Sequence, residues 1–203
     1  GSNATVGHGL GVAPKMIIFR RLDSADDTTV YHTSLGATKK IDLNNTGASS
    51  TVSSVFNNTA PTNSLMSVGT NGRTNASSGS YVAYAFAEKP GYSKFGEYKG
   101  NGDANGVFVY TGFAVKWLMV KEYGSTGNWL MWDNTTPNWN RAYKIANVAD
   151  AENSADNVSI DLLSNGFKFR GNAGDSNGDG NSILYMAFGQ SLVGSNNVPA
   201  TAR

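Results

Sequence analysis

The 203-residue sequence contains no cysteine and only two histidines, His8 and His32. Without cysteine, disulfides, thiolate metal sites and cysteine nucleophiles are excluded. A histidine-based metal or nucleophilic site would need both imidazoles to converge with a carboxylate, and we expect them to be surface or turn residues instead. The motifs G-x-S-x-G and H-E-x-x-H and the P-loop are also missing. We therefore predict that the protein is not an enzyme.

Charge is also scarce. Asp, Glu, Lys and Arg make up 15% of the sequence, and the formal net charge is +1. No run of Lys or Arg supplies the basic patch that binds nucleic acid or an anionic membrane. No apolar run approaches the roughly 20 residues that a membrane-spanning helix needs. We therefore expect no nucleic-acid partner and no membrane insertion.

The polar residues that are abundant are Asn, Ser, Thr and Gly, with 24 glycines in all. These residues form helices poorly, because Gly costs backbone entropy and the others compete for backbone hydrogen bonds. Short apolar runs with alternating polarity lie between turn residues, which is typical of strands. We predict an all-β fold in which antiparallel sheets pack face to face as a sandwich.

An internal repeat runs through the sequence. The apolar runs KMIIFR and WLMVK align Met16 with Trp117, at a spacing of 101 residues. The strand-like segments YVAYAF and ILYMAF end at Phe86 and Phe188, at a spacing of 102 residues. Matching features in the same order at nearly one spacing predict two sequence-related domains that arose by internal duplication.

At the second spacing Leu65 aligns with Phe167. The first half lacks counterparts of two strands expected at residues 94–98 and 107–110, so we expect it to be truncated at its start. The predicted organisation has four parts: a probable tag remnant at 1–4, a first β domain at 5–93, a second β domain at 94–190, and a C-terminal tail at 191–203.

Several phrases of the sequence carry a family resemblance. They are GHGLGVAPKMIIFR, TVYHTSLGATKK, VFNNTAPTNS, YVAYAFAEKPGYSKFGEYKGNG, FVYTGF and VPATAR. Together they resemble a tandem β-domain family at the C-terminus of tail-fibre and other virion proteins of bacteriophages, notably marine ones. The sequence departs from that pattern at residues 114–116, where a proline like Pro14 is expected. The resemblance implies a location on the virion and carries over no catalytic residue.

The function that this resemblance implies is adhesion of a structural virion protein to a host-surface glycan, protein or outer-membrane component. Other virion proteins are expected partners, and a homotrimer is expected although the sequence has no heptads that would enforce one. Two alternatives stay open. One is a purely architectural decoration or assembly domain, and the other is a secreted carbohydrate-binding module.

Aromatic residues crowd one region of the second half and are our candidates for ligand binding. Trp129 and Trp132 lie three positions apart, on opposite faces of a strand, so at least one belongs to the core. Trp139 lies between Pro-Asn and Asn-Arg and is the better loop candidate. Exposed rings of this kind stack on sugars or anchor protein partners. The candidate contacts are Trp139, Tyr143 and Trp132.

One loop is a candidate metal site. Asp175, Asn177 and Asp179 alternate as in the first half of an EF-hand loop and precede a glycine. The twelfth position, however, is Met186, so the bidentate glutamate is missing. The same residues also suit a plain β-turn. We expect no cofactor, with Ca²⁺ as the alternative at this loop.

Overall fold

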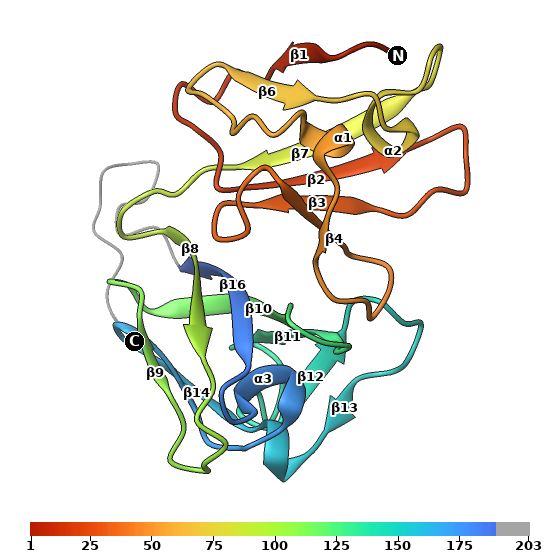
Figure 1. Cartoon of the computed structure of the whole chain (residues 1–203). Coiled ribbons are helices and arrows are strands. Elements are labelled where there is room, and N and C mark those ends of the chain that lie inside the picture. The colour runs from red at the N-terminus through yellow and green to blue at the C-terminus, as the bar shows by residue number, and fades with distance from the viewer. Residues whose placement is uncertain (190–203) are drawn as a thin grey trace. The chain divides into compact units, whose positions relative to one another are not determined.

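The protein divides into two compact units, Gly1–Ala87 and a second that starts at Glu88 (Figure 1). The structure, a computed structural model, describes residues 1–189, so the predicted tail lies outside the described residues. The unit boundary falls six residues before the expected start of the second domain at residue 94. The strands pair antiparallel throughout, and the all-β prediction is confirmed.

The first unit consists of a large sheet, a small sheet and two single-turn helices. Its elements are β1 (Ala4–Gly7), β2 (Met16–Arg21), β3 (Thr29–His32), β4 (Lys39–Asp42), β5 (Ser50–Thr51), α1 (Ser53–Phe56), β6 (Leu65–Val68), α2 (Gly72–Asn75) and β7 (Tyr81–Phe86). The large sheet has the order β5-β4-β3-β2-β7, and the small one pairs β1 with β6.

The second unit repeats this plan with added strands. Its elements are β8 (Ser93–Lys99), β9 (Phe108–Tyr110), β10 (Val115–Glu122), β11 (Trp129–Asp133), β12 (Ala142–Ile145), β13 (Asn153–Ser154), η1 (Asp156–Val158), β14 (Ile160–Leu163), β15 (Gly166–Phe169), α3 (Gly174–Asn177) and β16 (Ser182–Gly189). The large sheet has the order β13-β12-β11-β10-β16-β8, and the small one has the order β14-β15-β9.

Strand register makes the correspondence residue-specific. Met16 of β2 pairs with Phe86, and Trp117 of β10 pairs with Phe188, which are the two residue pairs that the sequence repeat aligns. β2, β3, β4, β5 and β7 thus correspond to β10, β11, β12, β13 and β16 in the same order. The shared topology supports the duplication, which itself stays a prediction.

Two sequence expectations about the first unit are wrong. β1 pairs with β6 as β9 pairs with β15, so the first unit does have a counterpart of one of the two opening strands. β1 begins at Ala4, so this strand includes the last residue of the expected tag remnant at 1–4, which stays a prediction. Leu65 is 41% exposed whereas Phe167 is fully buried, so the two residues do not play the same part despite their spacing.

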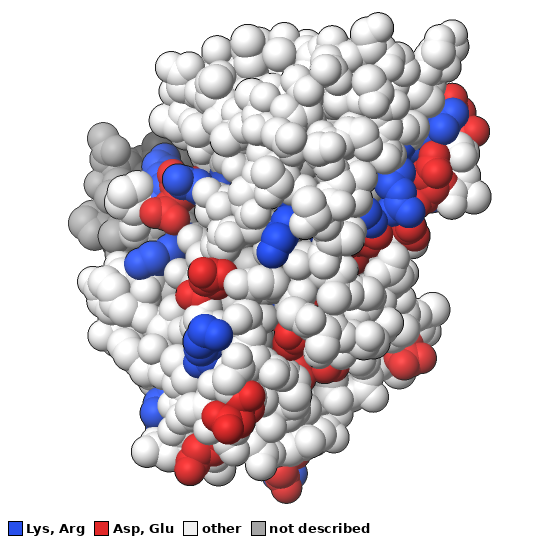
Figure 2. Space-filling view, viewed as in Figure 1, with Lys and Arg blue, Asp and Glu red and all other residues white. Residues whose placement is uncertain are grey.

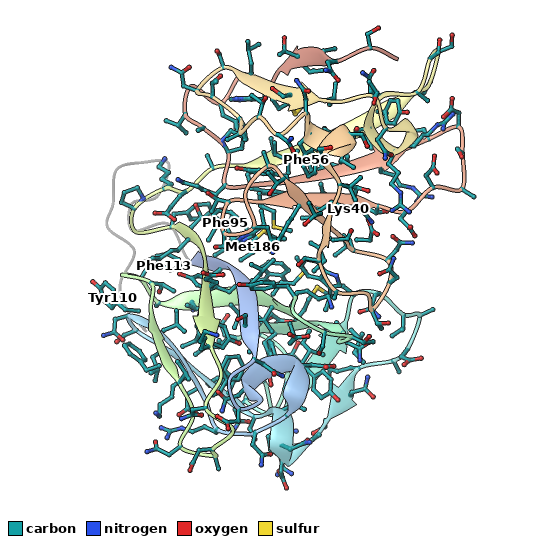
Figure 3. All side chains as sticks on the ribbon, viewed as in Figure 1. Lys40, Phe56, Phe95, Tyr110, Phe113 and Met186 are labelled. Carbon is teal, nitrogen blue, oxygen red and sulfur yellow. The ribbon has the colours of Figure 1, made fainter. Side chains whose placement is uncertain are left out.

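Apolar side chains from both sheets form the core of each unit. In the first unit Phe19 of β2 and Tyr31 of β3 pack on Phe56 of α1, with ring centroids 5.8 and 5.6 Å apart. Figure 3 labels Phe56. In the second unit Trp132 of the large sheet packs on Phe169 of the small sheet at 5.9 Å. Full burial of each such side chain contributes about 1.5–3 kcal/mol.

In each unit a cationic side chain donates a hydrogen bond to the loop of one hairpin, the β2–β3 hairpin in the first unit and the β10–β11 hairpin in the second. Arg20 at the end of β2 donates to the carbonyl of Asp26, and Lys121 of β10 donates from Nζ to the carbonyl of Gly127 at 2.7 Å. Lys121 is buried, and desolvation lowers the pKa of its ammonium group to about 8. The two cations hold corresponding hairpin loops although they are different residue types.

In both units an asparagine just after the next strand, Asn44 after β4 and Asn147 after β12, bonds to the same hairpin. The amide oxygen of Asn44 accepts from the backbone N–H of Thr28, and that of Asn147 accepts from Trp129, both at 2.8 Å. The Nδ2 group of Asn147 donates to Asn128 at 3.0 Å, as that of Asn44 donates to Asp27. These bonds satisfy loop groups that a strand ladder cannot reach.

Two glycines allow the small sheet of each unit to approach a helix closely. A Cβ atom at Gly69 would lie 2.0 Å from the carbonyl oxygen of Ser54, and one at Gly171 would lie 2.1 Å from that of Asn157. Both contacts are with backbone, which cannot rotate away. Only glycine therefore fits at these two corresponding positions.

Replacing either glycine by alanine is expected to destabilise its own unit by about 1–3 kcal/mol, the usual cost of overpacking. The measurement is amide hydrogen exchange on β2 and β10 in the full chain. Gly72→Ala and Gly174→Ala are the matched controls, since a Cβ there meets only Arg21 at 3.7 Å or nothing within 4 Å. Equal losses in the controls would refute the close-approach argument.

Candidate recognition loop in the second unit

The loop between β11 and β12, residues 134–141, differs most clearly from its counterpart in the first unit. Ile41 lies 11 positions after its strand partner Val30, whereas Lys144 lies 13 positions after its partner Met131. The second hairpin is therefore two residues longer. Surface loops are where insertions are tolerated and where binding residues concentrate.

Asp133 fixes the start of this loop. Its carboxylate accepts hydrogen bonds from the backbone and hydroxyl groups of Thr135 and Thr136, at 2.5–2.9 Å. The bond from the Thr135 hydroxyl is the largest of the effects that lower the pKa of Asp133 to about 2. The charged carboxylate thus organises the first turn of the loop. His32, at the corresponding position of β3, accepts similarly from the N–H of Ser34 at 3.2 Å.

The end of the loop is fixed independently. Asn138 has a positive φ of 57°, and its carbonyl accepts from the N–H groups of Arg141 and Ala142 at 2.8 and 2.9 Å. The carbonyl of Asn140 accepts from Ile160 at 2.8 Å, which ties the loop to the small sheet. The side chain of Arg141 forms an ion pair with Asp156. Backbone bonds on both sides therefore preorganise the segment between them.

Trp139 lies in that segment, as the sequence predicted. Its side chain is half-buried, and its neighbours Asn138 and Asn140 are exposed. The loop thus places an indole ring beside two amide side chains at the surface. Such a group can stack on the apolar face of a sugar and hydrogen-bond its hydroxyl groups.

The other two aromatic candidates lie elsewhere. Trp132 is 2% exposed and belongs to the core, so its assignment as a ligand contact is wrong. Its position on β11 points it between the two sheets, where it buries apolar area. Tyr143 is partly buried and packs on Trp132, with ring centroids 6.3 Å apart. Trp139 alone of the three lies in the loop.

The residues of the possible calcium loop point in different directions. The carboxylate of Asp175 accepts from the N–H and Nδ2 of Asn128 at 3.1 Å. Asn177 is fully buried, and its amide donates to Asn101, Asp103 and Gly171 at 2.9 Å. These contacts hold α3 in place within the second unit, and the calcium alternative stays a prediction. Asp179 instead lies beside Gly102, on the turn that follows α3.

The two histidines lie in different parts of the first unit, His32 at the end of β3 and His8 just after β1. His8 contacts the carbonyl of Thr62 at 3.1 Å and accepts from the N–H of Leu10. Within residues 1–189 no three His, Asp or Glu side chains gather as metal ligands would. In the same range, no helix is long and apolar enough to cross a membrane.

Within residues 1–189 four aromatic residues are exposed that the sequence reasoning missed: Tyr84, Tyr92, Phe108 and Tyr110. Phe108 and Tyr110 flank the buried Val109 on β9 and are 44% and 60% exposed. Figure 3 labels Tyr110. The Nζ atom of Lys94 lies 5.5 Å from the centre of the Tyr110 ring and donates a hydrogen bond to the backbone carbonyl of Tyr110. The alternation Phe-Val-Tyr was a signal for this, but it does not reveal which face of the strand is buried.

Charged side chains are sparse on the face of the molecule drawn in Figure 2. Figure 2 shows acidic and basic side chains in small groups on a face that is otherwise uncharged. A neutral polar surface favours uncharged ligands over nucleic acid.

The chain was compared with known families and proteins. A family model described as Domain of unknown function (DUF7483) matches residues 1–191. The chain belongs to the DUF7483 family. Neither the curated proteins nor the solved structures yield a match to this DUF7483 chain.

The low pKa of Asp133 makes the loop resistant to acid. Because the folded pKa is below the ordinary 3.8, the carboxylate stabilises the fold fully above that value, and this contribution falls as the pH drops towards about 2. We expect the amide resonances of Thr135 and Thr136 to titrate with a midpoint near pH 2. Asp133→Asn should abolish that titration, and a midpoint near 4 would contradict the hydrogen-bonded geometry.

Proposed function

We propose that this DUF7483 protein is a non-enzymatic structural module of a bacteriophage virion, from the C-terminal region of a tail fibre or related projection. Its task is adhesion to a host-surface glycan or outer-membrane component, bound by the 134–141 loop. The virion location is supported by the phage-like phrases of the sequence. The binding function is supported by one observation above all, the lengthened and doubly anchored loop that carries Trp139.

Preorganisation is what makes this loop suited to binding. A flexible loop loses conformational freedom when it binds, at about 0.5–1.5 kcal/mol for each immobilised side chain. In this protein Asp133 holds the backbone of residues 135–136, and the carbonyl of Asn138 closes the turn that contains Trp139, before any ligand arrives. The indole ring then supplies contact area, and the exposed amides supply hydrogen bonds.

A purely architectural role in the virion is the second candidate. The observation that favours it is the pair of exposed rings on β9, Phe108 and Tyr110, because exposed aromatic residues also anchor protein partners. A secreted carbohydrate-binding module would use the same loop chemistry as an adhesin.

The test of adhesion is a glycan array together with intact candidate host cells, with and without Ca²⁺. Trp139→Ala should reduce binding at least tenfold, because ring stacking contributes most of the contact area. Replacing residues 134–141 by the shorter loop 33–38 of the first unit should abolish binding and leave the fold intact.

Tyr110→Ala is the matched control, since it removes an exposed ring on another strand. Binding that survives the loop exchange but is lost in this control would move the site to β9. No binding by the folded wild-type protein in either assay would favour the architectural role.

A further inference from the structure

The outer face of the small sheet in the second unit carries two exposed rings in a row. Tyr110 and Phe108 are the most exposed aromatic side chains within residues 88–189, at 60% and 44%. They lie two residues apart on β9, about 6.6 Å along the strand, so both project from the same face of the sheet. Val109 between them is buried in the core on the other face.

The strand register shows what surrounds the rings. Phe108 pairs with Lys168 of β15, and Tyr110 pairs with Gly166. A Cβ atom at Gly166 would lie 3.0 Å from Cε2 of Phe108, so that ring lies beside the glycine. On the far side of β15, Leu163 of β14 also pairs with Gly166. Because paired residues share a face, the rings and an aliphatic side chain border one stretch of surface.

Two lysines flank this row of rings. The Nζ atom of Lys94 lies 5.5 Å from the centre of the Tyr110 ring and donates to the backbone carbonyl of Tyr110 at 3.1 Å. The Nζ atom of Lys168 donates to the carbonyl of Gly106 at 2.6 Å. One carbonyl lies just before β9 and the other at its end. An ammonium group therefore lies near each end of the row.

Neither ammonium group has an acidic partner. In the part of the chain that the structure describes, no ion pair includes Lys94 or Lys168. Asp161 is paired with Lys168 in the sheet, but its carboxylate accepts from Nε of Arg170 at 2.6 Å instead. A lysine has three donor protons, so both lysines keep protons for a ligand.

This composition favours a peptide over a sugar. The hydroxyl groups of a sugar need acceptors as well as donors. Besides the rings, the paired residues of this face supply an aliphatic side chain, a cation and a carboxylate that Arg170 already holds. An extended peptide with alternating acidic and apolar side chains matches better, because its apolar groups cover the rings while its carboxylates reach the lysines.

The last residues of the sequence lack the charge that this face calls for. Residues 190–203 contain no Asp and no Glu. Charge complementarity therefore points to a different polypeptide as the occupant.

We propose that the β9 face, formed by Phe108, Tyr110, Leu163, Lys94 and Lys168, docks an acidic segment of a protein partner. Exposed aromatic side chains anchor protein interfaces, and charge complementarity selects the partner and speeds association. The β9 face shares no residue with the 134–141 loop. It thus adds a protein-binding surface to the proposed adhesion function and does not rest on it.

The test measures the binding of two synthetic peptides to the full chain by isothermal titration calorimetry. The acidic peptide is acetylated Glu-Leu-Glu-Phe-Glu-Leu-Glu amide, and the matched peptide has Gln in place of every Glu. We expect the acidic peptide to bind at least tenfold more tightly at low salt. The difference should shrink at about 1 M NaCl, where the screening length is only about 3 Å.

Ring substitutions locate the binding face. Phe108→Ala and Tyr110→Ala should each weaken binding of the acidic peptide at least fivefold. Tyr84→Ala is the matched control, since it removes a ring of similar exposure, 55%, from β7.

Charge substitutions test the two lysines. Lys94→Gln and Lys168→Gln should each remove part of the difference between the two peptides, and together most of it. Lys168→Arg should retain binding, because it keeps the cation. Lys144→Gln is the matched control, since Lys144 is 53% exposed on β12 and lies in another sheet.

Several results would overturn the proposal. Equal binding of the two peptides would remove the charge argument, and binding that survives both ring substitutions would place the site elsewhere. Binding that appears only after deletion of residues 190–203 would assign the face to that segment. Binding of polygalacturonate but not of the peptide, lost in Tyr110→Ala, would assign the face to a sugar. Trp139→Ala should leave peptide binding unchanged, so this test and the glycan array fail independently.

Discussion

The buried amide of Asn177 is the contact on which the organisation of the second unit depends. It donates to the loop after β8 and to the turn after β15, and so joins the large sheet, the small sheet and α3 at one point. In the first unit Asn75, which is only partly buried, makes the corresponding bond to the carbonyl of Gly69 at 2.7 Å. With few ions available, buried amides and backbone groups hold the loops that connect the sheets.

The sequence was sufficient for the fold class, because it depends on patterns along the chain. The alignment of Met16 with Trp117 and of Phe86 with Phe188 coincides with strand register. The sequence was insufficient to predict which side chains are buried, because burial depends on where each strand lies in its sheet. Trp132, a candidate ligand contact, therefore lies in the core instead. Leu65 does not match the buried Phe167, because spacing alone does not tell which face of the sheet a side chain lies on.

The candidate loop was only partly visible beforehand. Trp139 stood out because turn residues surround it, but nothing near it in the sequence reveals the four bonds that Asp133 accepts. Within residues 1–189 no strand takes the place of β8 beside β7, as the alignment of the two halves predicted. Because the large sheets of the two units share a strand order, comparing one unit with the other identifies such differences.

The helices α2 and α3 contact the corresponding loops of their units through side chains of opposite charge. In the first, Arg73 of α2 forms an ion pair with Asp27 at 2.7 Å, while in the second, Asp175 of α3 accepts from Asn128. If the halves exchanged these helices while folding, Asp175 would face Asp27, two like charges at one contact. Tandem copies of similar sequence are prone to such misassembly. The reversed charge therefore penalises the mispaired chain and leaves each half to fold with its own segments.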